Sequence, residues 1–341
     1  MMKEKVYKIF KNKIILSLLL VLGVIIVFMS VINIIPPKKV MEDNPFIVGK
    51  DGRPLIAAHR GGKNLRPENT FSAIDYSYEK YHVDIIEMDL YLTKDNYLIL
   101  SHNSTINAYT ELNGLDDYYI RDHTLEEIRM FNFGYNFKDQ NGNYPYRNVL
   151  DGVENSQKSE VLLENKLRVV TITELFEKYA RTDVLYIIEI KDSGDRGIIA
   201  CDLLVAEMEK YDLVNKVAVG TFKDEVESYL NKTYPNVIRG GSFSVAKNFI
   251  ITQMLGVNLF DKSSFSCLQI PSSYNFKDVI TLNLAKKTYI NRAHRRGMSV
   301  QYWTINDKEE MIELINLGVD VIMTDNPDVL YEVLVEMGYY N

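Results

Sequence analysis

Two carboxylates occupy a strand-like run where apolar side chains would be expected. Glu87 and Asp89 lie two residues apart in DIIEMDL, so they would share one face of a strand. Glu189 and Lys191 have the same spacing in LYIIEIK. An unpaired buried carboxylate costs several kcal/mol, so such groups must be protonated, paired or metal-bound. We therefore expect these four side chains to meet at one site.

Three carboxylates and one lysine make an oxygen-rich site. A divalent cation such as Mg²⁺ or Ca²⁺ prefers such ligands, and we expect Glu87, Asp89 and Glu189 to hold one. The alternative is a buried salt-bridge cluster, in which Lys191 pairs with one acid. That alternative leaves two acids in excess, so the composition favours the cation.

Two histidines end strand-like runs in the same half of the chain. His59 closes LIAAH and His102 closes LILSH, and imidazole is the usual proton shuttle near neutral pH. Arg60, directly after the first histidine, carries a guanidinium suited to phosphate. The combination with a cation site and Lys191 indicates phosphoester chemistry. The other histidines lie in helix or loop patterns, where a structural role is expected: His82, His123 and His294.

For two further residues, the local sequence pattern indicates a structural role and no chemistry. Glu68 lies in RPENTF, which reads as a turn followed by a helix cap at Asn69 or Thr70. Trp303 is the only tryptophan and lies late in the strand-like run SVQYWTI, where it would ordinarily be a core residue.

The elements that must position these residues alternate between strands and helices. Such alternation is typical of βαβ units and a parallel sheet. Eight strands in roughly 290 residues fit a (β/α)8 TIM barrel better than a doubly wound sheet, and barrel active sites lie at the carboxyl ends of the strands. The predicted strands are 55–59, 84–90, 185–191, 216–222, 236–243, 267–271, 299–305 and 320–325; the predicted helices are 70–81, 171–180, 196–211, 224–233, 286–297 and 308–318.

One interval interrupts this alternation. Residues 103–170 are polar and rich in Tyr, Asn and Gly around one short helical piece, TLEEIRMF. We expect an inserted sub-domain after the second barrel strand. LILSH, residues 98–102, is expected as a short extra strand leading into it.

The N-terminus carries the signature of a membrane anchor. Residues 1–13 hold five lysines and one glutamate, and residues 14–35 form 22 uncharged residues ended by Pro36-Pro37. As a helix this run spans about 33 Å, enough for a bilayer core of roughly 30 Å. A cleaved signal peptide would have a shorter apolar run and an A-x-A-like site. We expect a cytoplasmic N-terminus (1–13), a transmembrane signal anchor (14–35), a linker (36–50) and an extracytoplasmic barrel domain (51–341).

Charge and cysteine content exclude some functions. The chain carries −7 and residues 1–13 carry +4, so the remainder carries −11, which argues against a nucleic-acid binder. Cys201 and Cys267 are too few for a disulfide framework and are expected to be buried thiols.

Four segments in order resemble the glycerophosphodiester phosphodiesterase family. They are HRGGKNLRPENTFSAI, VDIIEMDLYLTKDNYLILSHN, IIEIK and VQYWTINDKEEMIELINLGVDVIMTDNP. The resemblance covers about Leu55 to Leu330 and rests on HRG-x5-PENT, E-x-D, T-K-D, W-T-x-N and T-D-x-P. It implies a TIM barrel with an insertion after the second histidine.

The resemblance also implies roles and a reaction. His59 and His102 would be the acid/base pair, and Glu87, Asp89 and Glu189 the cation ligands. Residues that contact the substrate or its phosphate would be Arg60, Lys191, Glu68 and Trp303. The reaction would release glycerol 3-phosphate and an alcohol from a glycerophosphodiester or a cell-surface glycerophosphate polymer.

One position departs from the family pattern. The family has His-Asp at the second histidine, whereas this chain has His102-Asn103. Two alternatives stay open at this stage: a phospholipase D-like enzyme acting on intact lipid, and a non-catalytic binder of glycerophosphate polymers. The residues do not decide which histidine is the acid, which cation binds, or which alcohol is released.

Overall fold

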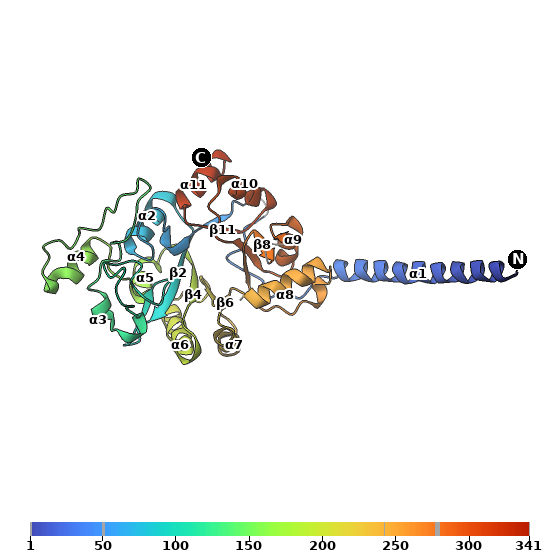
Figure 1. Ribbon diagram of the computed structural model, residues 1–341, viewed down its shortest axis with the longest axis horizontal. Coiled ribbons are helices and arrows are strands. Elements are labelled where there is room, and N and C mark those ends of the chain that lie inside the picture. The colour runs from blue at the N-terminus through green and yellow to red at the C-terminus, as the bar shows by residue number, and fades with distance from the viewer. Residues whose placement is uncertain (1, 50–51, 242, 277–279, 341) are drawn as a thin grey trace.

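Eight parallel strands and their helices form a barrel, from which one long helix projects (Figure 1). The computed structural model describes residues 2–49, 52–241, 243–276 and 280–340. Residues 50 and 51, at the expected boundary between linker and domain, and 242, in the expected fifth strand (236–243), lie outside the described residues. The predicted (β/α)8 fold with an N-terminal apolar helix is confirmed.

The barrel strands follow one another in chain order around the ring. All seven strand pairs along the path β6-β5-β4-β2-β1-β11-β10-β7 are parallel. A parallel bridge between Gly240 and Cys267 joins the two ends and nearly closes the ring. The strands are β1 (Leu55–Ala58), β2 (Ile85–Leu92), β4 (Leu185–Ile190), β5 (Val217–Gly220), β6 (Ile238–Arg239), β7 (Cys267–Ile270), β10 (Ser299–Tyr302) and β11 (Val321–Thr324).

The inward face of the strands changes character along its length. Small and aliphatic side chains fill the amino-terminal half of the interior, among them Ala57, Ile85, Ile187, Ala218 and Val321. Because side chains two residues apart share a face, the next inward positions on β2 and β4 are carboxylates. The apolar interior therefore ends in a charged layer at the carboxyl ends of the strands.

The helices surround the barrel and pack their apolar faces on the outward side of the strands (Figure 1). Thr70 caps the first of them, accepting a hydrogen bond from the Ala73 backbone N–H, as expected for RPENTF. Two outer helices have no counterpart in the sequence prediction, α8 and α11. The outer helices are α2 (Phe71–Tyr81), α5 (Ile172–Tyr179), α6 (Gly194–Lys210), α7 (Asp224–Thr233), α8 (Phe243–Met254), α9 (Lys287–His294), α10 (Lys308–Leu317) and α11 (Pro327–Glu336).

The insertion lies on one side of the barrel and has its own small core. β3 (Leu98–Leu100) pairs antiparallel with β2 and leads into it, as predicted. Ile106, Ile120 and Phe133 are buried in this second core. The insertion contains η2 (Ile120–Asp122), α3 (Leu125–Ile128), η3 (Asn155–Gln157) and α4 (Lys158–Glu164).

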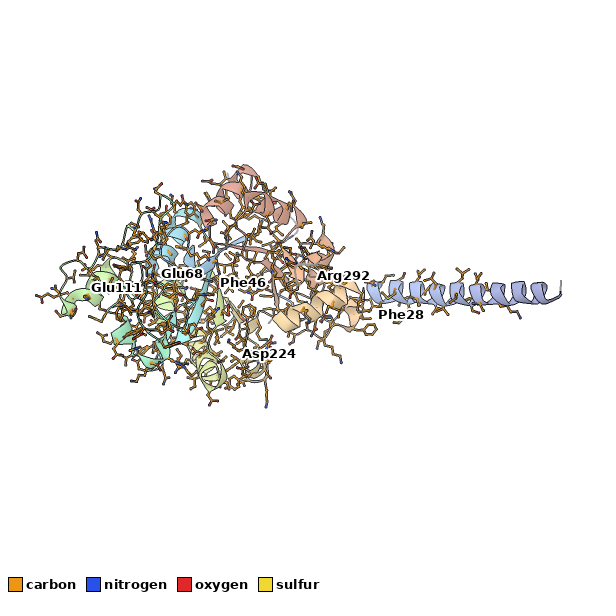
Figure 2. All side chains as sticks on the ribbon, in the orientation of Figure 1. Phe28, Phe46, Glu68, Glu111, Asp224 and Arg292 are labelled. Carbon is orange, nitrogen blue, oxygen red and sulfur yellow. The ribbon has the colours of Figure 1, made fainter. Side chains whose placement is uncertain are left out.

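The N-terminal helix α1 (Met2–Ile34) leaves the barrel at the end opposite to α3 and α4 (Figure 1). Its segment Lys13–Ile34 is long and apolar enough to cross a membrane, a property that a signal sequence would share. The residues that follow α1 pack on the barrel. Phe46 is fully buried among the inward side chains, and Figure 2 shows it in the middle of the barrel. Asn44 donates hydrogen bonds to the carbonyls of Ser266 and Gly297.

Candidate active site

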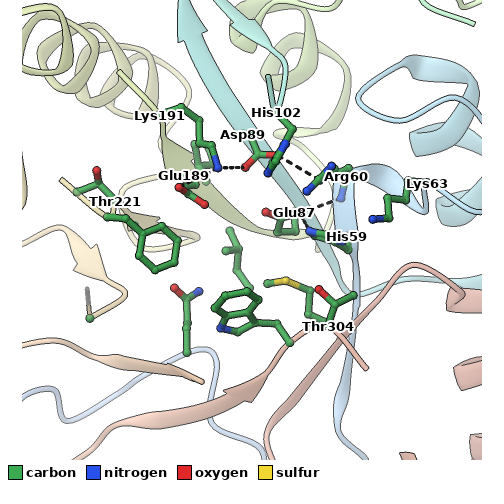
Figure 3. Close-up of a pocket in the computed structure, with 18 residues that line it drawn as sticks. His59, Arg60, Lys63, Glu87, Asp89, His102, Glu189, Lys191, Thr221 and Thr304 are labelled. Carbon is green, nitrogen blue, oxygen red and sulfur yellow. Dashed lines mark hydrogen bonds and ion pairs between the residues drawn. The ribbon is translucent and has the colours of Figure 1, made fainter. Parts of the chain in front are cut away.

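A cavity of about 280 Å³ opens at the carboxyl ends of the barrel strands. Every barrel strand, or the residues just after it, contributes to its wall. Figure 3 shows the charged side chains crowded together on one side of this cavity. The lining residues are His59, Arg60, Lys63, Glu87, Asp89, His102, Ile187, Ile188, Glu189, Lys191, Gly220, Thr221, Phe222, Gly241, Gln269, Trp303, Thr304 and Met323.

The parallel register of β2 and β4 places two of the carboxylates next to each other. Asp89 is the register partner of Glu189, so both side chains enter the cavity at the same level. Lys191, two residues further along β4's face, has its Nζ 3.3 Å from Asp89 Oδ1 and 3.1 Å from Glu189 Oε1. Burial raises the pKa of Glu189, although the Lys191 ammonium opposes this shift.

Glu87 lies one inward position deeper and is buried. Its Oε2 accepts a hydrogen bond of 2.8 Å from the Arg60 backbone N–H and lies 3.9 Å from His59 Nε2. Burial is the largest influence on its pKa, which rises to about 7, with the Asp89 charge acting in the same direction. The Glu87 carboxylate is therefore costly to ionise unless a cation stabilises it.

His59 is held by hydrogen bonds and ion pairs that link the first barrel strand to the last. Its Nδ1 lies 2.5 Å from Asp325 Oδ1, and the other Asp325 oxygen accepts 2.8 Å from Asn306 Nδ2 and lies 3.3 Å from Lys63 Nζ. Burial alone would lower the pKa of His59, but the negative charges of Glu87 and Asp325 outweigh it and raise that pKa.

Arg60 extends from a short 3-10 turn, η1 (His59–Gly61), directly after β1. Its backbone is in the left-handed region (φ 52°), which is uncommon outside glycine. The Asn69 backbone N–H donates 2.9 Å to the Arg60 carbonyl, which ties the turn to the loop before α2. Arg60 Nη1 lies 3.3 Å from Glu68, and Nε lies 3.5 Å from Asp89 Oδ2. The guanidinium thus lies between two acids at the cavity rim.

His102 follows β3 and faces the same charged group (Figure 3). Its Nδ1 lies 3.1 Å from Asn103 Oδ1, so in the neutral ring Nδ1 carries the hydrogen and Nε2 is free to accept a proton. Partial burial lowers the pKa of His102, and the positive charges of Arg60 and Lys191 add to this effect. The two histidines therefore have pKa values displaced in opposite directions.

The wall that faces these charged groups is neutral. Thr221, Gln269 and Thr304 contribute polar groups, and the rings of Phe222 and Trp303 lie with centroids 6.1 Å apart. Gln269 Nε2 donates 2.9 Å to Gln301 Oε1, which fixes its amide. This wall can bind the uncharged part of a substrate but contributes no titrating group.

A larger second hollow, of about 560 Å³, adjoins the cavity where Arg60 and Lys63 line both. The insertion supplies one side of it through Asn103, Tyr109 and Phe137, among others. Its polar lining consists of five amides, the Tyr109 hydroxyl and five charged side chains, which are Arg60, Lys63, Glu68, Lys138 and Asp139. The amides and the hydroxyl can hydrogen-bond to polar molecules.

No three His, Cys, Asp or Glu side chains within the described ranges are gathered tightly enough to enclose a metal ion. The amine of Lys191 lies between Asp89 and Glu189, and the guanidinium of Arg60 lies beside Asp89. One oxygen, Asp89 Oδ2, is buried and has no hydrogen-bond partner. The oxygen-rich group that the sequence predicts is present, with Asp89 and Glu189 turned toward the two cations and Glu87 toward the Arg60 backbone N–H and His59.

The structure brings eight of the nine predicted site residues to the cavity, and Glu68 lies at the second hollow beside Arg60. Sequence reasoning missed Asp325, Asn306, Lys63 and Gln269. Asp325 had a signal, because it ends the strand-like run DVIMTD two inward positions after Val321. Asn306 also had a signal, because it is the last residue of the W-T-x-N motif, although its partner Asp325 lies 19 residues away.

Comparison with known proteins identifies relatives of this barrel. Residues 59–329 match the model of the glycerophosphoryl diester phosphodiesterase family. A glycerophosphodiester phosphodiesterase from Caldanaerobacter subterraneus subsp. tengcongensis is 25% identical over 288 residues, covering 83% of this chain and 99% of the relative. A lysophospholipase D from Mus musculus is 23% identical, covering 81% of this chain and 80% of the relative.

A solved structure shares the fold. The phosphodiesterase from Oleispira antarctica, in complex with the product sn-glycerol-3-phosphate, has a TM-score of 0.57 and 17% identity, and the match covers 83% of this chain and 97% of that one.

Proposed function

The chain belongs to the glycerophosphoryl diester phosphodiesterase family, and from this membership we propose how its site cleaves a glycerophosphodiester. The chain is an enzyme, a phosphoric diester hydrolase that acts on glycerophosphodiesters. In our proposal His102 is the general base, His59 is the general acid, and a divalent cation is bound by Glu87, Asp89 and Glu189.

The assignment of His102 as the base follows from its charge state. Its lowered pKa keeps the ring neutral at physiological pH, and its Nδ1 contact with Asn103 leaves Nε2 free to accept a proton. In this role His102 removes the proton from the attacking group, which is either water or the 2-hydroxyl of the glycerol moiety. Attack by water gives glycerol 3-phosphate directly, whereas attack by the 2-hydroxyl gives a cyclic glycerol phosphate that water must then open to give glycerol 3-phosphate.

The assignment of His59 as the acid follows from the opposite shift. The charges of Glu87 and Asp325 raise the pKa of His59 against the effect of burial, which favours the protonated ring, and the Asp325 contact at Nδ1 leaves Nε2 as the atom that donates. His59 then protonates the departing alkoxide oxygen. Two titrating groups with pKa values displaced in opposite directions are the usual basis for separate acid and base roles.

Arg60 and Lys191 are the cations that bind the phosphate in this proposal. Both are now paired with acids, Arg60 with Glu68 and Lys191 with Asp89 and Glu189. A phosphate that enters the cavity would accept hydrogen bonds from both side chains. Their positive charges would then be balanced in part by the phosphate.

The donor set fits a divalent cation by its chemistry. Asp89 Oδ2 is buried without a hydrogen-bond partner, and burial together with neighbouring carboxylates raises the pKa of Glu87 and Glu189. These are the features of carboxylates that lack a sufficient counter-charge. When bound by Glu87, Asp89 and Glu189, Mg²⁺ or Ca²⁺ would polarise the phosphoryl oxygen and stabilise the charge of the transition state.

The two ends of the substrate would be bound on different sides of the phosphate. The glycerol end fits the neutral wall, where Trp303 and Phe222 offer ring surfaces and Gln269 an amide. The alcohol that leaves would extend past Arg60 and Lys63 into the second hollow. The amides and the Tyr109 hydroxyl there would hydrogen-bond to a polar alcohol, or to the next unit of a cell-surface glycerophosphate polymer.

We further propose that α1 anchors the enzyme in the cell membrane with the barrel outside. The lysine-rich residues 1–13 and the apolar span Lys13–Ile34 support this orientation. The insertion, which lines the second hollow, lies at the opposite end of the molecule from α1 (Figure 1). This arrangement favours water-soluble diesters or wall polymers over lipid still embedded in the bilayer.

The observation that carries the mechanism is geometric: His59 and His102 line one cavity beside the three carboxylates, and each has its Nδ1 held by a neighbouring side chain. Full-length enzyme in detergent, supplied with Mg²⁺, Ca²⁺ or Mn²⁺, should release glycerol 3-phosphate from at least one of a panel of glycerophosphodiesters. Lysophosphatidylcholine in the same panel tests the lipid-cleaving activity for which the mouse relative is named. Absence of cleavage across the panel with every cation, together with calorimetric binding of a glycerophosphate polymer, would indicate a binder and reject the mechanism.

A further inference from the structure

A patch of exposed apolar side chains lies where α1 joins the barrel. It consists of Ile251 and Met254 at the end of α8, Leu255 just after it, and Phe260 in the 3-10 turn η4 (Asn258–Phe260). Their exposed fractions are 42%, 55%, 63% and 57%. We call these four residues the junction patch. Single exposed apolar residues are ordinary, but four within ten residues on one surface mark an interaction site.

The junction patch adjoins the apolar helix directly. Asn33, near the end of α1, donates 2.9 Å from Nδ2 to the carbonyl of Gly256, which follows the patch residue Leu255. Gly256 is also in contact range of Met29, because a Cβ at that glycine would lie 3.1 Å from Met29 Cε. The patch is therefore beside the last turns of α1.

Two arginines of the α9 region fix this junction. Arg295 Nη1 donates 2.8 Å to the carbonyl of Asn33, and its Nη2 donates 3.0 Å to the carbonyl of Ile35, both at the end of α1. Arg292 bonds Asn33 Oδ1 at 3.2 Å and the Gln253 carbonyl at 2.5 Å. Cations suit the carbonyl groups left unpaired at a helix C-terminus. Figure 2 shows Arg292 between the barrel and the helix.

Helix geometry sets the depth of the patch. Met29 lies five residues before Ile34, the last residue of the apolar span Lys13–Ile34. At 1.5 Å per residue this is about 8 Å inside the end of the span. If that span crosses a bilayer, whatever touches Met29 lies at the boundary between headgroups and acyl chains.

The surroundings of the patch carry basic residues. Lys38 follows α1, Lys247 lies one turn before Ile251 on α8, and Lys262 follows η4; all three are exposed. The chain beyond residue 13 nevertheless carries a net charge of −11. Lysines concentrated at this end match a surface of anionic phospholipid headgroups.

We propose that the junction patch inserts into the outer leaflet of the bilayer that α1 crosses, with the neighbouring lysines contacting anionic phospholipid headgroups. This inference rests on the proposed membrane location of α1. The barrel would then have two attachments, a spanning helix and an interfacial patch, joined rigidly through Asn33, Arg292 and Arg295. The insertion and the second hollow would consequently face away from the membrane (Figure 1).

The chain offers a matched pair of labelling positions. Leu255 is 63% exposed in the patch, and Leu115 is 65% exposed in the insertion. The native thiols do not compete for label, because Cys201 and Cys267 are buried and burial raises the pKa of each to about 12. Full-length Leu255→Cys and Leu115→Cys proteins are labelled with an environment-sensitive fluorophore. They are then reconstituted in nanodiscs of phosphatidylcholine and phosphatidylglycerol, with and without a nitroxide-bearing lipid.

The nitroxide lipid should quench about half of the fluorescence at position 255, since an interfacial apolar face lies ~5–10 Å into the headgroup and acyl boundary. Position 115 should be unaffected. Equal fluorescence with and without nitroxide at position 255, in protein that co-migrates with the nanodiscs, would overturn the proposal. So would a detergent-solubilised dimer that Leu255→Glu dissociates, because the patch would then bind a second copy.

Flotation of the nanodiscs tests separately whether α1 places the protein in the membrane. Protein that fails to co-migrate with nanodiscs would reject the membrane location of α1, and the patch proposal with it. Glycerophosphodiester cleavage, measured on the same samples, tests the catalytic proposal alone, because the patch lies outside the active-site cavity.

Discussion

The two walls of the active-site cavity differ in chemistry: one is formed at the first three barrel strands, and the other, here called the second part of the barrel, at the five that follow. The first three strands, β1, β2 and β4, together with β3, supply His59, His102 and the acid–cation cluster. The second part supplies neutral groups, including Gln269 from β7 and Trp303 after β10. One wall can move protons and stabilise phosphate charge, whereas the other can only bind.

Substitutions in the two walls should therefore change different kinetic constants. Groups that act on the transition state should change kcat, and groups that contact substrate equally in ground and transition states should change KM. Asp325 is the exception, since it comes from the second part of the barrel yet serves the first wall by holding His59.

Removal of the proposed base should have the largest effect. His102→Ala is expected to lower kcat by about 10³-fold with little change in KM, because general base catalysis contributes ~10²–10⁴-fold. Steady-state kinetics on a glycerophosphodiester will measure both constants. His82→Asn is the control, since His82 lies at the end of α2 outside the cavity and Asn tolerates its left-handed backbone. A kcat within threefold of the parent enzyme would remove His102 from the mechanism.

Loss of a proposed cation ligand should come second. Asp89→Asn is expected to lower kcat/KM by about 10²-fold, since a bound cation contributes several kcal/mol to transition-state stabilisation. The concentration of Mg²⁺ or Ca²⁺ at half-maximal activity should rise as well. Activity titrations with each cation will show this, and Glu79→Gln, an exposed acid on α2, is the control. An unchanged cation titration would support the salt-bridge cluster instead.

A change in the neutral wall should affect binding more than turnover. Trp303→Ala is expected to raise KM by about tenfold, because burying an aromatic ring against a ligand is worth ~1–2 kcal/mol. Trp303→Phe retains a ring and should recover most of the affinity. Should kcat fall a hundredfold in Trp303→Ala with KM unchanged, the division between the two walls would be wrong.

The smallest change concerns pH. The reaction needs neutral His102 and protonated His59, so the rate should fall below the lowered pKa of His102 and above the raised pKa of His59. Asn103→Asp places a negative charge 3.1 Å from His102 Nδ1, which stabilises the protonated ring. The acidic limb of the kcat–pH profile should move up by about 1 unit.

Asn103→Ala is the companion variant, because it removes the contact with His102 without adding charge. Its acidic limb should stay at or below that of the parent enzyme. If only the alkaline limb moves up in Asn103→Asp, His102 is the acid and His59 the base, the reverse of the proposed roles.

The barrel and most of the site could be predicted from the sequence. Seven of the eight barrel strands form close to the predicted ranges, because their alternation with amphipathic helices is a local pattern. The strand predicted at 236–243 is shorter: β6 has two residues, and Phe243 begins α8 instead. Glu87, Asp89, Glu189 and Lys191 were identifiable because a charged residue on the inward face of an apolar strand needs a partner. Helices α8 and α11 were missed, although α11 begins at Pro327, a common first residue of helices.

The tertiary structure decided what the charges do. Register alone brings Asp89 opposite Glu189, and the nearly closed barrel brings Asp325 of the last strand to His59 after the first. The opposite pKa shifts of the two histidines arise from burial and from charges supplied by other strands. Such quantities depend on distances between residues far apart in the chain, and composition and spacing do not contain those distances.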